Sequence, residues 1–182
     1  MNKKVRWITE TAVMLALLVS LQALTKGLNN QFITGSCVNT VLAVTVLVAG
    51  LSSGITVALI SPVLAFLLGI APQILTVPAI MVGNTVFVVL LHFLADRTGK
   101  NIGKQIAAWL IAAVAKFAAL YIIVVKVICG VMSESLLAAG TLKEPMLKAL
   151  PATFSWPQLV TALIGGAIAL AIVPVLRKAL HR

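Results

Sequence analysis

An uncharged stretch places the strongest limit on how this chain of 182 residues can fold. Between Lys26 and Asp96, 69 consecutive residues include no Asp, Glu, Lys or Arg. A helix that crosses a bilayer needs about 20 apolar residues, so the stretch has room for about three crossings. In the whole chain 61% of residues are hydrophobic and 10% are charged, whereas soluble globular domains carry about 25% charged residues. We therefore predict an all-α integral membrane protein.

Apolar runs separated by turn-forming residues predict a bundle of six transmembrane helices in a single domain, residues 1–182. Glycine, serine and proline at 50–54 and 69–73 divide the uncharged stretch, and Pro62 falls inside its short middle run. In the connection 133–156 we expect a short interfacial helix near 142–150, ended by Pro151. The expected spans are residues 7–24, 33–49, 55–68, 76–95, 105–132 and 159–175.

The basic residues predict that both termini are cytoplasmic. Six spans place both termini and the fourth connection on one side, and Lys and Arg are enriched in cytoplasmic loops. That side would carry Lys3, Lys4, Arg6, Arg97, Lys100, Lys104, Arg177, Lys178 and Arg182, and the other side Lys26, Lys143 and Lys148. This topology accounts for the net charge of +10, so nucleic acid is not an expected partner.

One short motif leaves an enzymatic alternative open. Residues 50–54 match the GxSxG pattern of serine hydrolases, with Ser52 or Ser53 as a nucleophile. That elbow needs a strand before the serine and a histidine within hydrogen-bonding reach, and the only histidines, His92 and His181, are expected near cytoplasmic helix ends. A turn of small residues between two helices explains the motif better, so we expect no enzyme activity.

No pattern in the sequence predicts a metal or a cofactor. Cys37 and Cys129 form no CxxC motif, and no HExxH or paired carboxylates occur. Besides the serine hydrolase, a structural membrane scaffold protein is the other alternative to a small-molecule-binding protein.

Two lysines lie inside the expected fifth span, where a charge costs at least about 2.5 kcal/mol. At 100° per residue, Lys116 and Lys126 fall within about 80° of each other, so one interior face can carry both. No acid lies in the middle of a span, and a bound anion could therefore pair with Lys126. The alternative for Lys126 is snorkelling to the outer interface, and the deeper Lys116 could instead bond carbonyls or support helix packing.

Polar residues that reach into the spans from the outer side predict a pocket with apolar walls, as is typical of small-molecule sites. Each of them alone could equally make an interhelical hydrogen bond, and Trp156 could serve only as an interface anchor. The candidate substrate-binding residues are Asn29, Asn30, Gln31, Asn39, Asn84, Tyr121, Lys126, Trp156 and Gln158.

The chain resembles the substrate-binding S components of energy-coupling factor (ECF) transporters, which are small bacterial six-helix membrane proteins. The resemblance covers nearly the whole chain and uses its length and predicted inside termini. It also includes Ala12-Val13-Met14-Leu15-Ala16 in the first helix and Leu47-Val48-Ala49-Gly50-Leu51-Ser52-Ser53-Gly54 entering the third.

The resemblance implies that Ala12 and Ala16 contact a transmembrane T component, which two cytoplasmic ATPases drive. It implies capture of a vitamin or similar micronutrient near the outer face of the bacterial cytoplasmic membrane, under the loop that joins the first two helices. Release would follow when the S component topples in the membrane. No thiamin, riboflavin or biotin pattern occurs, so the substrate stays open, and the lysines favour a carboxylate or phosphate.

Overall fold

The computed structural model describes residues 2–70, 73–96 and 101–180, and the described residues form helices with no strand among them. The predicted all-α fold is therefore confirmed. The α-helices are α1 (Lys3–Lys26), α2 (Gln31–Val44), α3 (Leu51–Leu67), α4 (Val77–Leu94), α5 (Ile102–Leu120), α6 (Ser133–Ala138), α7 (Glu144–Phe154) and α8 (Trp156–Ala179). The π-helical segments η1 (Thr45–Ala49) and η3 (Tyr121–Val131) extend α2 and α5, and a 3₁₀ turn η2 (Ile74–Thr76) precedes α4.

Five helical segments are long and apolar enough to cross a membrane: Lys3–Lys26, Gln31–Ala49, Ile74–Leu94, Ile102–Val131 and Glu144–Ala179. The remaining predicted span corresponds to α3, an apolar helix of 17 residues. At 1.5 Å per residue it extends about 25 Å, less than the hydrocarbon core of about 30 Å. Six crossings therefore stay a prediction.

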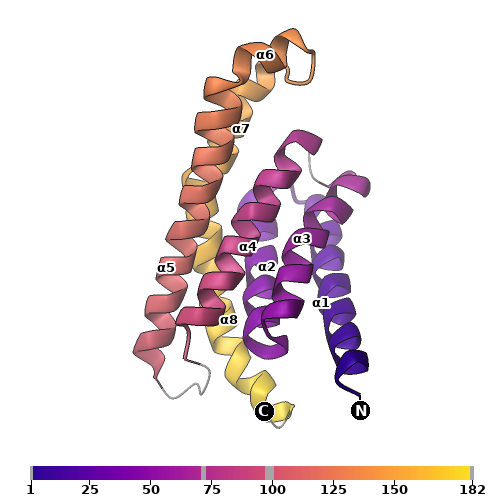
Figure 1. Cartoon of the computed structure of the whole chain (residues 1–182), viewed down its shortest axis with the longest axis vertical. Coiled ribbons are helices and arrows are strands. Elements are labelled where there is room, and N and C mark those ends of the chain that lie inside the picture. The colour runs from indigo at the N-terminus through magenta and orange to yellow at the C-terminus, as the bar shows by residue number, and fades with distance from the viewer. Residues whose placement is uncertain (1, 71–72, 97–100, 181–182) are drawn as a thin grey trace.

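The long helices pack in a closed ring of six. In order around the ring, α1 contacts α2, α2 contacts α8, α8 contacts α5, α5 contacts α4, α4 contacts α3, and α3 contacts α1. Figure 1 shows the first and last described residues at the same end of this bundle, while η3, α6 and α7 extend beyond the other helices at the opposite end. An even number of crossings would give this placement of the two ends.

Two predicted helix boundaries are wrong. The third helix begins at Leu51 rather than at 55, because Gly50 alone makes the turn, with φ 92°, a conformation that favours glycine. Pro151 lies inside α7, which continues to Phe154. A proline inside a helix removes one hydrogen bond and crowds the preceding turn, but the buried side chains of Leu150 and Phe154 hold the last turn against the second apolar cluster.

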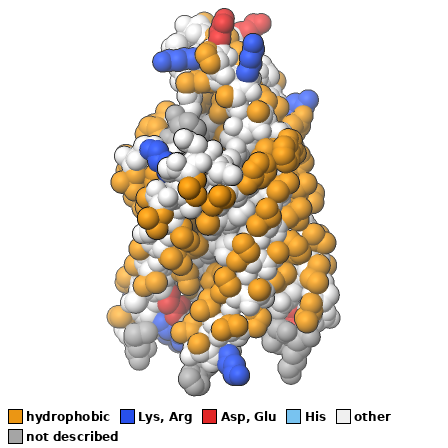
Figure 2. Space-filling model, turned by 180° about the vertical axis from the view of Figure 1, so that it is seen from behind, with side chains coloured by type: hydrophobic (Ala, Val, Ile, Leu, Met, Phe, Trp, Pro, Cys, Tyr) orange, Lys and Arg blue, Asp and Glu red, His pale blue; other side chains and the backbone are white. Residues whose placement is uncertain are grey.

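Charged side chains gather at the two ends of the molecule, and apolar side chains cover the flank between them (Figure 2). The end that holds the first and last described residues carries Lys3, Lys4, Arg6, Lys104, Arg177 and Lys178, and the opposite end carries Lys26, Lys143 and Lys148. Arg97, Lys100 and Arg182 lie outside the described residues, as do Ala71 and Pro72 of the second predicted turn. Which end faces the cytoplasm stays a prediction.

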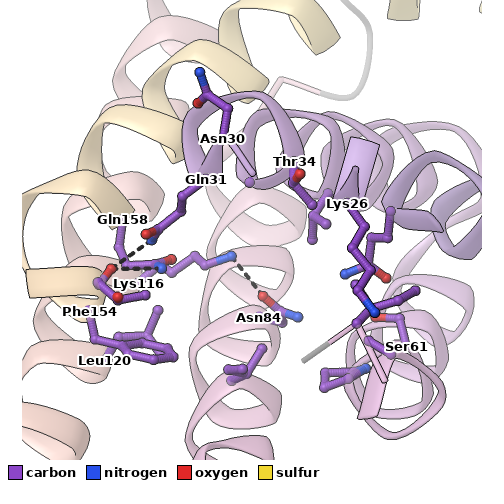
Figure 3. A pocket seen from close by; sticks show the side chains of 18 of the residues that line it. Lys26, Asn30, Gln31, Thr34, Ser61, Asn84, Lys116, Leu120, Phe154 and Gln158 are labelled. Carbon is purple, nitrogen blue, oxygen red and sulfur yellow. Dashed lines mark hydrogen bonds between the residues drawn. The ribbon is translucent and has the colours of Figure 1, made fainter. Parts of the chain in front are cut away.

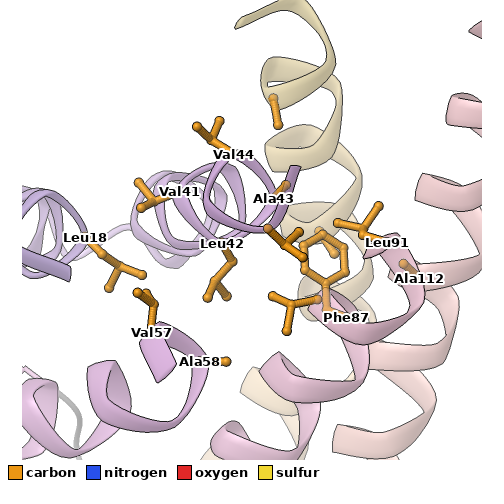
Figure 4. Close-up of a cluster of buried hydrophobic side chains, with 14 of the residues drawn as sticks. Leu18, Val41, Leu42, Ala43, Val44, Val57, Ala58, Phe87, Leu91 and Ala112 are labelled. Atoms are coloured by element: carbon orange, nitrogen blue, oxygen red, sulfur yellow. The ribbon is translucent and has the colours of Figure 1, made fainter. Parts of the chain in front are cut away.

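The buried apolar side chains form two clusters. The larger one joins α1, α2, α3, α4, α5 and α8 and includes Leu18, Leu42, Val57 and Phe87 (Figure 4). The smaller one lies around Leu120 and joins α4, α5, η3 and α7. On both α4 and α5, a polar residue lies between the parts that enter the two clusters, namely Asn84 and Lys116.

Candidate functional site

A cavity of about 410 Å³ opens at the end of the bundle that lies away from the termini. Its mouth is formed by the connection between α1 and α2, and its walls come from α2, α3, α4, α5, α7 and α8 (Figure 3). The volume lies within the range of about 300–1,000 Å³ that is common for small-molecule sites. Apolar side chains such as Val38, Pro62 and Leu120 form much of the lining.

Lys116 marks the inner end of this cavity. It lies 14 residues into α5, about 20 Å along the helix axis, and only 3% of its surface is exposed. Its Nζ donates to Asn39 Oδ1 at 2.5 Å and to Asn84 Oδ1 at 2.7 Å, and it lies 5.5 Å from the centre of the Phe87 ring. Polar contacts from α2 and α4 therefore hold a buried cation between two amides and an aromatic face.

No described carboxylate lines the cavity or pairs with Lys116. An ammonium group has three N–H donors, and the two asparagine oxygens accept from two of them. Neither of these hydrogen bonds uses the third donor, and Lys116 is among the residues that line the cavity. The site thus combines a buried amino group that can carry a positive charge with a hydrogen-bond donor that neither asparagine uses.

A second layer of hydrogen bonds fixes Asn39. Its Nδ2 donates to Thr161 Oγ1 at 3.3 Å, and the Thr161 hydroxyl donates to the Gln158 carbonyl at 3.1 Å. These hydrogen bonds can form because α2 and α8 approach closely at Gly165. A Cβ on that residue would lie 2.6 Å from Asn39 Cβ. The amide orientation that accepts from Lys116 is therefore set by helix packing.

Three polar atoms on cavity-lining residues are buried without a hydrogen-bond partner among the described residues: Asn84 Nδ2, Ser61 Oγ and Gln22 Oε1. Buried polar atoms in folded proteins nearly always have a partner. Each of these atoms comes from a different helix, and all three belong to one cavity. Because the residues that carry them line the cavity, a molecule bound there is a candidate partner for these atoms.

Hydrogen bonds close the side of the cavity next to α7. The Thr153 carbonyl accepts from Gln31 Nε2 at 2.7 Å and from Gln158 Nε2 at 3.2 Å. At the mouth, Lys26 Nζ donates to the Gly69 carbonyl at 2.5 Å. These contacts join the ends of α1, α2, α3, α7 and α8 around the cavity.

The structure brings most of the predicted binding residues together. Asn39 does not line the cavity, but its Oδ1 accepts a hydrogen bond from Lys116, which does. The predicted residues that line the cavity are Asn29, Asn30, Gln31, Asn84 and Gln158. Asn30 also caps α2, since its side chain accepts from the Phe32 and Ile33 amides. Whether these residues bind a substrate stays a prediction.

Tyr121, Lys126 and Trp156 do not line the cavity. Lys126 is exposed, and its Nζ lies 5.7 Å from the centre of the Tyr121 ring. Trp156 is 60% exposed and packs on Phe32, with ring centres 5.5 Å apart. Both arrangements suit residues at a membrane interface.

The expectation that Lys116 and Lys126 share an interior face does not hold, and the helix type explains why. The segment η3 begins at Tyr121 with π-helical bonding, in which each residue bonds five positions along and turns through less than 100°. Lys126 therefore ends on a different side of the helix. Of the two lysines in this helix, Lys116 lines the cavity and Lys126 does not.

The serine motif does not form a nucleophile elbow. The helical segment η1, not a strand, precedes Gly50, and Ser52 is exposed in the first turn of α3. Ser53 is buried, and its Oγ accepts from Thr11 Oγ1 at 2.9 Å. His92 packs edge-on against Phe93, and His181 lies outside the described residues.

Cys37 and Cys129 are free thiols on α2 and η3, and no metal-binding group of His, Cys, Asp or Glu occurs in the described part of the chain.

The first helix presents an exposed apolar face. Ala12 and Ala16 are both exposed, and the neighbouring Val13 and Leu17 are exposed by 57% and 47%. Of the candidate membrane spans, α1 has the smallest buried share, 11% of its window. This face has no partner within the described chain.

No family model matches the chain, and comparisons with curated proteins and with solved structures found no match.

Proposed function

We propose that the protein is the substrate-capture subunit of an ECF-type importer, which binds a vitamin or similar micronutrient at the outer face of a membrane. The observation that carries this proposal is the cavity that ends at Lys116 and opens away from the termini. Its size, apolar walls and few convergent polar groups are those of a small-molecule site. Outside the helices the described residues form only short connections, as expected of a subunit that other chains energise.

In this proposal the protein is a six-span bundle in the bacterial cytoplasmic membrane, with cytoplasmic termini. The shorter α3 crosses as part of the ring, and the cavity faces outward. The basic residues near both termini support this orientation, because cytoplasmic segments are enriched in Lys and Arg. Lys126 then lies near the outer interface, where its long side chain can reach the headgroups.

The exposed face of α1 is the proposed contact for a transmembrane T component. Lipid tails are as apolar as the helix, so helices associate in membranes through close packing, and small residues such as Ala12 and Ala16 permit it. Two cytoplasmic ATPases would drive toppling of the bundle and inward release. The protein itself would then catalyse no reaction.

Affinity purification from native membranes in mild detergent tests the proposal. Wild type should recover a T component and two ATPases, and Ala12→Trp should lose them because the indole separates the two helices. Leu110→Trp is the matched control, since it places the same ring on an exposed position of α5, a helix that does not adjoin α1 in the ring. Absence of these partners from the wild-type sample would contradict the proposal and favour a scaffold or a hydrolase.

A further inference from the structure

We propose that the molecule captured in the cavity is a small organic monoanion whose carboxylate binds to Lys116 Nζ and Asn84 Nδ2. This inference rests on the proposed function and specifies the chemical class of its substrate. It names Lys116 as the residue that selects the charge of the ligand.

The first step concerns the charge of Lys116. Its buried ammonium is bonded by two neutral amides and faces a neutral ring, and no described carboxylate pairs with it. Burial disfavours the charged form of a lysine unless an opposite charge or hydrogen-bond acceptors compensate it. Since the cavity is the open side of Lys116, a ligand can supply the missing negative charge there.

The second step concerns the free donors. Asn84 Oδ1 accepts from Lys116, while Nδ2 of the same amide is buried without a partner. Nδ2 belongs to the amide whose Oδ1 accepts from Lys116 Nζ, and Figure 3 shows the Lys116 and Asn84 side chains meeting at the inner end of the cavity. A carboxylate has two oxygens that accept hydrogen bonds, one for each of these donors.

The amount of negative charge distinguishes a carboxylate ligand from a phosphate ester. A phosphate ester carries a charge of about −1.5 to −2 at neutral pH, and a single buried lysine compensates only one negative charge. The other lysine of the cavity, Lys26, is exposed at the mouth and bonded to the Gly69 carbonyl. The inner end therefore fits a monoanion better than a dianion.

Equilibrium dialysis with the purified full-length protein tests the proposal. Each of two matched probe sets contains an acid, its amide and a phosphate ester. The aromatic set is benzoate, benzamide and phenyl phosphate, and the aliphatic set is hexanoate, hexanamide and hexyl phosphate. In at least one set we expect the acid to bind about tenfold or more tightly than the amide, as a charge-assisted hydrogen bond requires. The phosphate ester should bind more weakly than the acid.

Two variants test the role of the inner end. Lys116→Met should weaken binding of the acid by about tenfold to a hundredfold. Asn84→Asp keeps the size of the side chain but places a carboxylate beside Lys116, so it should exclude the acid by supplying the anion internally. Lys126→Met removes a lysine that does not line the cavity and should leave acid binding unchanged.

The outcomes separate this inference from the proposed function. The proposed carboxylate ligand is overturned if, in both probe sets, the amide or the phosphate ester binds as tightly as the acid or more tightly. Unchanged acid binding by a folded Asn84→Asp variant overturns it too. Absence of acid binding by wild type at about 10 mM overturns it as well. In each case co-purification with a T component would still support the capture subunit, whereas loss of those partners from wild type contradicts the function itself.

Discussion

Lys116 Nζ on α5 lies 2.7 Å from Asn84 Oδ1 on α4, and this hydrogen bond joins two neighbouring helices at the inner end of the cavity. The same ammonium reaches Asn39 on α2, so three helices meet at one buried cation. Apolar packing alone would hold these helices together without a charge. An ionisable residue inside a membrane span is costly, and in our proposal the ligand is what uses it.

Removing the Lys116 amino group alone should destabilise the fold, and removing Asn39 and Asn84 as well should restore the stability. Lys116→Met leaves two buried amide oxygens without a donor and should cost about 1–3 kcal/mol. The triple variant Lys116→Met/Asn39→Leu/Asn84→Leu should unfold at or above the wild-type temperature, because an apolar core replaces the polar one. Thermal unfolding in detergent measures both. A triple variant less stable than Lys116→Met would mean that the cluster serves the fold rather than binding.

The Lys126 side chain should be dispensable for ligand binding. It lies over the Tyr121 ring on the exposed side of η3, so Lys126→Met should change neither affinity nor the unfolding temperature by much. Affinity for any ligand captured by wild type provides the measurement. A large loss would show that the site extends onto η3.

The contact between α2 and α8 should tolerate no added methyl group at Gly165. A Cβ there would lie 2.7 Å from the Ser36 carbonyl oxygen and 2.8 Å from the Thr40 amide nitrogen. Because these are backbone atoms, the helices must separate, and Gly165→Ala should cost about 1–3 kcal/mol. Gly27→Ala, which meets nothing within 4 Å, is the control. Equal unfolding temperatures for the two variants would refute the close approach.

The serine motif should prove structural. Ser53→Ala removes the buried acceptor of the Thr11 hydroxyl and should cost about 0.5–1.5 kcal/mol, whereas Ser52→Ala changes an exposed residue and should have almost no effect. A fluorophosphonate probe should label neither wild type nor the variants. Labelling of wild type that Ser52→Ala or Ser53→Ala abolishes would establish a hydrolase.

Hydropathy predicted the helices well, because an apolar run of sufficient length has few alternatives to a helix in lipid. It could not place the start of α3, since one glycine at φ 92° replaced a longer turn. Polar residues inside a span or at its outer end also led to the prediction of Asn84 and Gln158 in the cavity, and both line it. Lys126 was misplaced because regular α-helical spacing was assumed through η3, and no simple sequence pattern announces a π-helix.

Lys116 illustrates what sequence reasoning lacked. Its position in the middle of a span indicated a buried partner, but the partners come from α2 and α4, 77 and 32 residues away in sequence. The unpartnered Ser61 and Gln22 were equally hidden, because a serine or glutamine in an apolar helix looks like an interhelical hydrogen bond. Only the packing of the helices around the cavity separates these cases.

The most direct test of the capture proposal is mass spectrometry of small molecules released from the purified protein. Thr34→Trp fills the cavity from α2, while Leu59→Trp places the same ring on an exposed position of α3 as a control. We predict one small molecule in near-equal amount to the protein in wild type and Leu59→Trp, and its loss from Thr34→Trp. The same small molecules in all three samples, or none in wild type, would contradict capture in this cavity.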